Sequence, residues 1–153
     1  MKFSKILVPV KGHPADDQAI QLAAYLARQS KAKILVIYVI EMRRSLPLEA
    51  ENEPEIQRAE QILEHAQKVA KEAGVHVDSD LLQARVVAPV LLDEAMERGV
   101  DLIIMGVPYR PPLEEFYLGS GVRYILKNAL CPVWLCRQEA QEGQKGSPPN
   151  KGA

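Results

Sequence analysis

Five short apolar stretches, separated by segments with helical periodicity, most constrain how this chain can fold. Three of them, residues 6–10, 33–40 and 101–105, are apolar almost throughout, which is typical of strands buried on both faces of a parallel sheet. Residues 75–83 alternate polar and apolar side chains, which predicts a half-exposed strand at a sheet edge. With the last stretch, residues 132–136, the pattern predicts an α/β fold: an open, doubly wound five-stranded parallel sheet with helices on both faces.

The segments between these strands carry the start and stop features of helices. Pro14 suits the first turn of a helix that continues to about residue 30. Residues 55–73 show the clearest helical spacing in the chain, and the glycine that follows favours a helix end. Two further helices are predicted, one over residues 89–98 and one that begins at Ser120.

Composition excludes several classes of protein. The chain has 153 residues and a formal net charge of −1, which argues against nucleic-acid binding driven by bulk positive charge. No run approaches the ~20 apolar residues of a membrane span, and the N-terminal apolar run is too short for a signal peptide. We therefore expect a cytoplasmic protein without membrane insertion. It should comprise one domain, residues 1–137, and a disordered tail, residues 138–153, that is rich in Gly, Pro, Gln and Lys.

The segment between the fourth strand and the last helix holds the best candidate binding site. Gly106 is expected to end the strand, and Gly119, Ser120 and Gly121 open the helix, where backbone N–H groups can face an anion. In doubly wound sheets, ligands bind beyond the carboxyl ends of the strands, where the strand order reverses. The turn after the first strand, residues 11–13, is expected to meet this segment there. Ser120 can also cap the helix, and both roles are compatible.

Other chemistries have weaker support. Lys11 either contacts a phosphate or pairs with Asp16 or Asp17 on the surface, and His13 is expected to be an exposed turn residue. A hydrolytic triad built on Ser120 lacks the sequence context of a nucleophile. No two histidines have the spacing of metal ligands, and the two cysteines are expected to be reduced thiols. The sequence therefore predicts no catalytic residue and no metal site.

Taken together, these stretches resemble the universal stress protein family. The likeness rests on ILVPV with its turn and Ala-rich helix, on VDLIIMG at 100–106, and on LGSGVRYILKNALCPVWLCR at 118–137. It covers about residues 2–137. The resemblance implies the strand order 3-2-1-4-5 and a homodimer formed through the last strand, Pro132 to Cys136. It also implies binding of ATP, AMP or another adenine nucleotide, with or without magnesium and with little or no catalysis.

Members of this family that bind ATP carry the motif G-x2-G-x9-G-[S/T]. Gly106 fits the first glycine, and Gly119 with Ser120 fits the final pair at the correct spacing, but Tyr109 stands at the second glycine. Left-handed backbone costs a tyrosine about 1–2 kcal/mol, which a glycine at this position would avoid. Two roles are open for the Tyr109 side chain: stacking on the ligand or plugging the phosphate site. By this resemblance the nucleotide contacts are expected from nine residues: Pro9, Val10, Lys11, Val39, Gly106, Tyr109, Gly119, Ser120 and Gly121.

Lys11 also departs from the family pattern. Members frequently place an aspartate after the first strand, where it touches the nucleoside. An ammonium cannot accept a hydrogen bond from a ribose hydroxyl, but it can pair with a phosphate.

The sequence leaves two main functions open. One is a cytoplasmic homodimeric sensor that binds an adenine nucleotide without strong catalysis. The other is a dimeric interaction or scaffold module that has lost nucleotide binding, which Tyr109, Lys11 and the prolines of the loop suggest. Slow nucleotide hydrolysis is a third and weaker hypothesis, because the sequence shows no general base near the candidate phosphate site. The apolar edge strand around Trp134 is expected at the dimer interface, the alternative being that Trp134 packs into its own domain.

Overall fold

The computed structural model describes residues 2–48, 50–109 and 119–140. Strands and helices alternate along these residues. The strands are β1 (Lys5–Pro9), β2 (Lys33–Glu41), β3 (Asp78–Ala84), β4 (Leu102–Val107) and β5 (Val133–Arg137). The helices are α1 (Ala15–Ser30), α2 (Glu53–Glu72), α3 (Val87–Glu97) and α4 (Ser120–Asn128).

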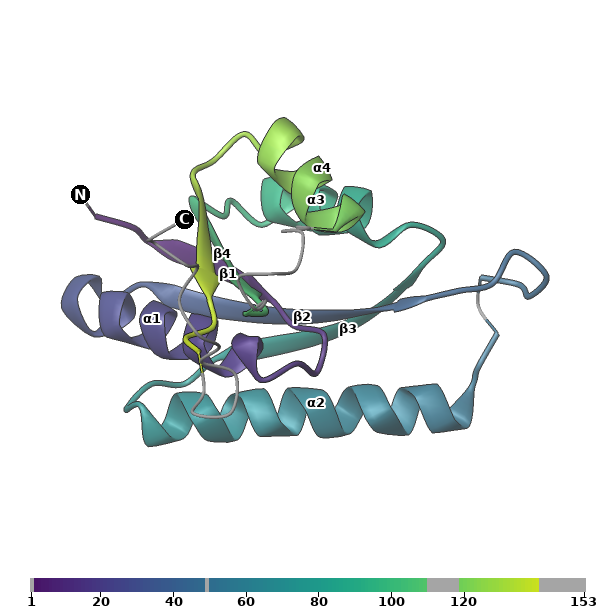
Figure 1. The fold of residues 1–153 in the computed structure, drawn as a ribbon, viewed down its shortest axis with the longest axis horizontal. Coiled ribbons are helices and arrows are strands. Elements are labelled where there is room, and N and C mark those ends of the chain that lie inside the picture. Colours follow the sequence, from purple (N-terminus) through teal and green to yellow (C-terminus); the bar gives the residue numbers. More distant parts are fainter. Residues whose placement is uncertain (1, 49, 110–118, 141–153) are drawn as a thin grey trace, which may run out of the picture.

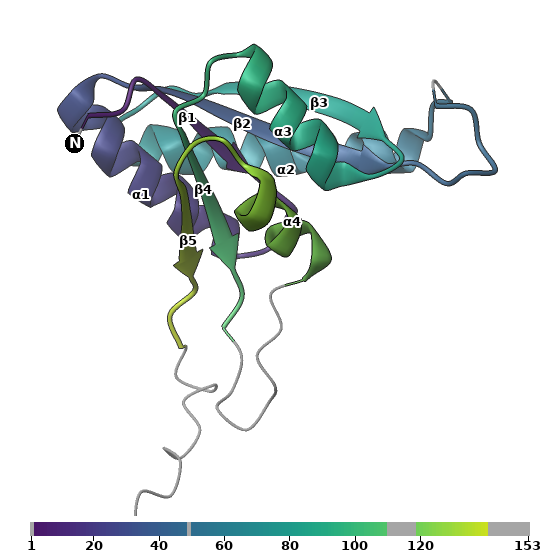
Figure 2. The same cartoon turned by 90° about the horizontal axis from the view of Figure 1, so that it is seen from above.

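The five strands form one parallel sheet in the order β3-β2-β1-β4-β5, which confirms the predicted fold class and strand order. The order reverses at β1, because the chain adds β2 and β3 on one side of it and β4 and β5 on the other (Figure 2). The connections that leave β1 and β4 therefore diverge to opposite faces of the sheet. Such a divergence is where open α/β sheets bind their ligands.

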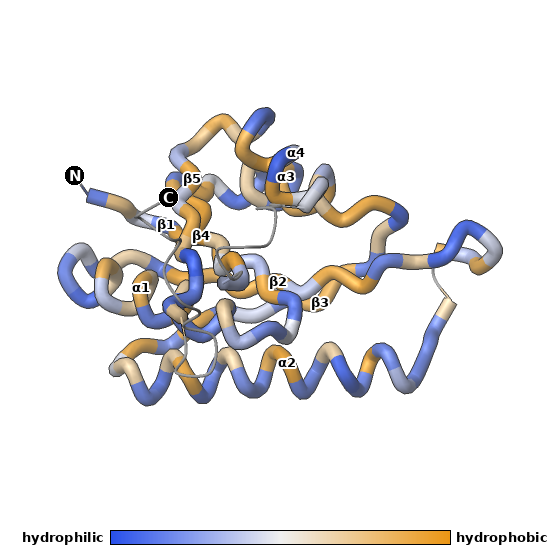
Figure 3. Tube along the Cα trace, in the orientation of Figure 1, coloured by the Kyte–Doolittle hydropathy of each residue, from blue (hydrophilic) through white to orange (hydrophobic). Residues whose placement is uncertain are grey.

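Two helices cover each face of the sheet. α1 and α2 lie on one face, and α3 and α4 lie on the other (Figure 1). Successive strand residues point to opposite faces, so Ile6 and Val8 of β1 pack towards α1 and α2 while Leu7 packs towards α3 and α4. β1, β2 and β4 are accordingly hydrophobic along most of their length, whereas α2 alternates between hydrophobic and hydrophilic residues (Figure 3).

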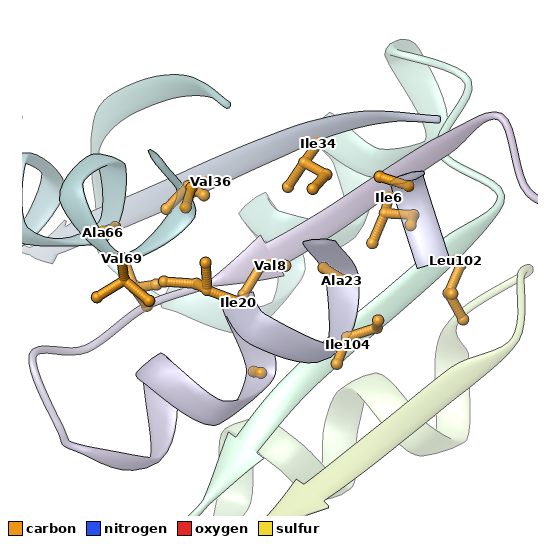
Figure 4. Packing of buried hydrophobic residues seen from close by; sticks show 14 of the residues in the cluster. Ile6, Val8, Ile20, Ala23, Ile34, Val36, Ala66, Val69, Leu102 and Ile104 are labelled. Carbon is orange, nitrogen blue, oxygen red and sulfur yellow. The ribbon is translucent and has the colours of Figure 1, made fainter. Parts of the chain in front are cut away.

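The larger core lies beneath α1 and α2. Ile6 of β1, Ile20 of α1 and Leu102 of β4 are completely buried there. Figure 4 shows these side chains converging with those of Val36 and Val69, from β2 and α2. Burying each large aliphatic side chain contributes about 1.5–3 kcal/mol, so this core fixes α1 and α2 against the ends of the strands that carry the site.

The helix α2 begins two residues before the start predicted at residue 55. Asn52 adopts an extended backbone conformation as its N-cap, and its side chain accepts a hydrogen bond from the Glu55 N–H at 3.3 Å. Pro54 then occupies the first turn, where its missing N–H costs nothing. The cap therefore lies upstream of the apolar periodicity on which the sequence prediction rested.

β4 and β5 extend further than the sequence predicts. Gly106 does not end β4, since it pairs with Cys136, and Val107 pairs with Arg137. The N–H of Gln138 then donates to the Val107 carbonyl oxygen at 2.7 Å, and Gln138 is buried. The expected strand end at Gly106 is therefore wrong, because β5 continues alongside and supplies hydrogen-bond partners for two more residues.

The two edges of the sheet differ. β3 lies at one edge, as its alternating pattern predicted, although it begins at Asp78 rather than at residue 75. β5 forms the other edge. Most of the predicted disordered tail, residues 141–153, lies outside the described residues. Among the described residues, no helix combines the length and apolar character needed to cross a bilayer.

Candidate functional site

A cleft of about 810 Å³ lies beyond the carboxyl ends of β1, β2 and β4. It opens where the strand order reverses, which is where the sequence predicted a binding site. Its lining comes from residues 9–11 and 37–41, from Asp16, Glu55 and Arg58, from residues 86–89 and Leu91, and from residues 105, 106, 120–122, 124 and 125. The volume falls within the 300–1,000 Å³ typical of small-molecule and cofactor sites.

The cleft brings together seven of the nine residues proposed as nucleotide contacts. They come from three places in the chain, namely the end of β1 with its following turn, the carboxyl-terminal part of β2, and the junction of β4 with α4: Pro9, Val10, Lys11, Val39, Gly106, Ser120 and Gly121. Gly119 and Tyr109 are not among the lining residues. Residues 110–118, which join β4 to α4, lie outside the described residues.

The turn between β1 and α1 is organised by Asp16, which the sequence suggested as a possible surface partner of Lys11. Oδ2 of Asp16 accepts hydrogen bonds from the backbone N–H groups of Lys11, Gly12 and His13, at 2.9, 2.8 and 3.1 Å. Burial raises the pKa of the Asp16 carboxyl above its ordinary value, although the three N–H groups act in the opposite direction. These N–H groups already have an anionic acceptor, so they are not available to a bound phosphate.

Two cationic residues line the cleft beside this turn. Lys11 lines it from the end of β1, and Arg58 lines it from α2. Arg58 lies close to the turn, because its Nη2 is 3.7 Å from the position that a Cβ would take on Gly12. No salt bridge joins Lys11 or Arg58 to a carboxylate within the described residues, so the suggested pairing of Lys11 with Asp16 or Asp17 is not observed.

Gly106 is required by packing. A Cβ at this position would lie 2.2 Å from the carbonyl oxygen of Ala15 and 3.0 Å from the backbone N of Asp16. Backbone atoms cannot move aside as a flexible side chain can. The glycine thus lets β4 approach the first turn of α1, a role independent of any ligand.

Gly119, and not Ser120, is the residue that caps the N-terminus of α4. Gly119 is the N-cap of α4, with φ of 84° and ψ of 150°, a conformation that is essentially restricted to glycine. Ser120 is the first helical residue, and its exposed side chain makes no capping hydrogen bond. The suggested capping role of Ser120 is therefore wrong, and the residue lines the cleft at the N-terminus of α4.

Tyr109 interacts with the sheet edge. The guanidinium carbon of Arg137, in β5, lies 5.1 Å from the centroid of the Tyr109 ring, within the range of a cation–π contact. Neither the stacking role nor the plugging role suggested for Tyr109 is supported by this placement.

The opposite end of the cleft is apolar. Val39 of β2 faces the start of α3, where Val87 and Leu91 also line the cavity. Val86, just before α3, is 58% exposed, so the apolar end opens to solvent at its rim. A planar, weakly polar group can bind between such surfaces, whereas a phosphate cannot.

Metal and nucleophilic chemistry find no support in the part of the chain that is described. No group of three or more His, Cys, Asp or Glu residues there could hold a metal ion. His13 is exposed and lines a separate cavity of about 270 Å³ between α1 and α2, so it does not lie with Ser120. Cys131 and Cys136 are unbridged, and burial raises the pKa of both thiols.

Comparison with known proteins agrees with the fold. The family model for universal stress proteins matches residues 2–137. A universal stress protein of Methanocaldococcus jannaschii is 29% identical over 146 residues, covering 92% of this chain and 85% of its own.

Solved structures show the same fold. The universal stress protein from Archaeoglobus fulgidus in complex with dAMP superposes with a TM-score of 0.70 at 20% identity, covering 88% of this chain and 98% of its own. A universal stress protein in complex with cAMP superposes with a TM-score of 0.66 at 19% identity, covering 88% of this chain and 97% of its own.

Proposed function

Because this chain belongs to the universal stress protein family, we propose that it binds an adenine nucleotide in the cleft and acts as a sensor of that nucleotide. The layout of the cleft carries the proposal. Its apolar end, between β2 and α3, suits a base, and the N-terminus of α4 at the other end suits a phosphate. β1 lies between β2 and β4 in the sheet, so the ribose would lie over the β1–α1 turn.

The N-terminus of α4 is the natural anion-binding element of the site. The first backbone hydrogen bond of this helix runs from the Arg123 N–H to the Gly119 carbonyl oxygen, at 3.1 Å. The N–H groups of the preceding first-turn residues have no partner within the helix and carry its partial positive charge. Family members with dAMP and cAMP bound support the adenine class, and the proposal extends to ATP and AMP, with or without magnesium.

The proposed role is binding without strong catalysis. No hydrogen bond joins Ser120 to a carboxylate or histidine within the described residues, and the carboxylate of Asp16 is engaged by the β1–α1 turn. We further propose that the protein is a cytoplasmic homodimer that associates through β5. β5 is an edge strand with no further strand paired to it among the described residues, and its Leu135 is exposed, which supports this assembly.

Isothermal titration with ATP and with AMP tests the nucleotide site. Saturable heat is expected with both compounds. Gly121→Asp places an anion at the first turn of α4, where helix polarity favours it, and there is room because a Cβ on Gly121 would meet Ala88 only at 4.0 Å. This variant should fold normally and bind at least about tenfold more weakly, because its carboxylate would repel the phosphate.

Gln21→Glu is the matched control, since Gln21 is an exposed residue of α1 outside the cleft and the change alters net charge equally. It should bind as the parent protein does. No heat with either nucleotide at millimolar concentration would contradict the sensor and leave the dimeric interaction module as the function.

A further inference from the structure

Building on the proposed nucleotide site, we propose that the ligand is an adenosine phosphate that carries a second phosphate on a ribose hydroxyl. The inference concerns the middle of the cleft, over the β1–α1 turn. Lys11 and Arg58 both line the cavity there, and neither forms a salt bridge within the described residues. The site therefore has two cationic centres, one at this turn and one at the N-terminus of α4.

The neighbouring carboxylates leave Lys11 without an ionic partner within the described residues. Asp16 already accepts three backbone hydrogen bonds. Glu41 lies four residues beyond Ile37, which is the register partner of Pro9, so it lies further along β2 than the end of β1. Glu55 precedes Arg58 by about one turn of α2 and also lines the cleft, so it offsets part of the charge of Arg58 and leaves Lys11 as the main cation at the turn.

The chemistry of Lys11 favours a phosphorylated ribose over an unmodified one, because an ammonium binds a phosphate more strongly than a neutral hydroxyl. Carboxylates bind ribose hydroxyls by accepting their hydrogen bonds, and an ammonium has no acceptor. Dinucleotide-binding folds illustrate the difference, since an acidic residue binds a ribose hydroxyl where a basic residue accommodates a ribose phosphate. The backbone N–H groups of the turn cannot substitute, because Asp16 occupies them.

The order of elements places the second phosphate. With the base at β2 and the 5′-phosphate at α4, the two ends of the ligand are separated by two strand spacings, about 10 Å. The ribose then lies above β1, beside Lys11 and Arg58. A 5′-diphosphate would instead extend its charge along the α4 end of the cleft.

The test compares three compounds by titration calorimetry: ADP, adenosine 3′,5′-bisphosphate and adenosine 2′,5′-bisphosphate. All three carry two phosphates, so a difference in affinity reports phosphate position rather than phosphate number. At least one bisphosphate should bind about tenfold or more tightly than ADP, as expected for a charge-assisted contact. The preferred isomer identifies the phosphorylated hydroxyl.

Two variants test whether Lys11 causes the preference for a bisphosphate over ADP. Lys11→Met should bring the ratio of bisphosphate to ADP affinity close to one. Lys33→Met removes the same charge from an exposed residue at the opposite end of β2, and it should leave the ratio unchanged.

The outcomes separate this inference from the proposed function. ADP that binds as tightly as both bisphosphates would overturn the inference and keep the nucleotide site. A preference that survives in Lys11→Met would overturn the role of Lys11. Absence of binding by all three compounds at millimolar concentration would overturn the nucleotide site itself.

Discussion

At the scale of single residues, the positions of the nucleotide motif serve different physical purposes. Gly106 satisfies a steric requirement between β4 and α1, while Gly119 satisfies a backbone requirement at the N-cap of α4. Asp16, which lies outside the motif, holds the β1–α1 turn in place. These separate roles allow the contributions of individual residues to folding and to binding to be measured independently.

Gly106→Ala should destabilise the fold. The new Cβ would lie 2.2 Å from the Ala15 carbonyl oxygen, so α1 or β4 must shift, at a cost of about 1–3 kcal/mol or more in the free energy of unfolding. Urea denaturation measures this change. Gly121→Ala is the control, because its Cβ has room and alanine favours a helix over glycine by about 0.5–1 kcal/mol. Equal stability of the two variants would contradict the steric role of Gly106.

Asp16 and Asp101 should make the stability of the protein depend on pH in opposite directions. Burial raises the folded-state pKa of Asp16, so its contribution to stability is present at low pH and is lost as the pH rises through that pKa. Burial also raises the pKa of Asp101, but hydrogen bonds from Ser4 and Lys5 outweigh it and lower the pKa overall. Its contribution is present above the unfolded pKa of 3.8 and is lost as the pH falls through the folded pKa.

Urea unfolding from pH 3 to 7 separates the two carboxylates. Asp16→Asn should remove a decrease in stability with rising pH, and Asp101→Asn should remove an increase. Parallel profiles for the two variants would contradict these assignments.

At the scale of elements, most of the architecture follows from the sequence. The buried strands β1, β2 and β4 are uniformly apolar, so their number, type and parallel arrangement were predictable. The ends of strands and helices were less predictable, because they depend on hydrogen-bond partners from other parts of the chain. β4 passes through Gly106 since β5 lies alongside, and α2 begins early since Asn52 caps it. The roles of Asp16 and Arg58 could not be found from spacing, because each depends on how α1 or α2 packs against the β1–α1 turn.

Amide hydrogen exchange should distinguish the two helix starts that border the cleft. The N–H groups of Lys11, Gly12 and His13 are bonded to Asp16 and should exchange slowly with or without nucleotide. The first-turn N–H groups of α4, at residues 120–122, lack helical partners and should gain protection when ATP or AMP binds. Added protection at the β1–α1 turn alone would mean that the phosphate binds there instead.

At the scale of the whole molecule, the exposed edge of the sheet bears on assembly. Trp134 is a poor probe of that edge, because its ring packs edge-to-face against the ring of Phe3, with 5.4 Å between the ring centroids. It also packs against the core beneath α1. This contact supports the intramolecular alternative for Trp134. Leu135, the next residue of β5, is 37% exposed and so is the better probe of association.

Leu135→Arg should shift the protein from dimer to monomer in sedimentation velocity, because a charge would enter the proposed β5 interface. Leu46→Arg is the control, since Leu46 is 38% exposed in the segment between β2 and α2, and β2 lies on the side of β1 opposite β5. Both variants should keep the parent circular dichroism spectrum. A folded Leu135→Arg protein that remains dimeric would move the interface to another surface.

The contact between Gly106 and Ala15 also bears on how relatives of this protein should be compared. A relative that lost its ligand would still need glycine at this position for as long as β4 runs against α1. Selection for folding alone would retain it, so the first glycine of the motif says little about binding within the family. The residues that should vary with the ligand are those that line the cleft and are not buried in the core, with Lys11 and Ser120 foremost.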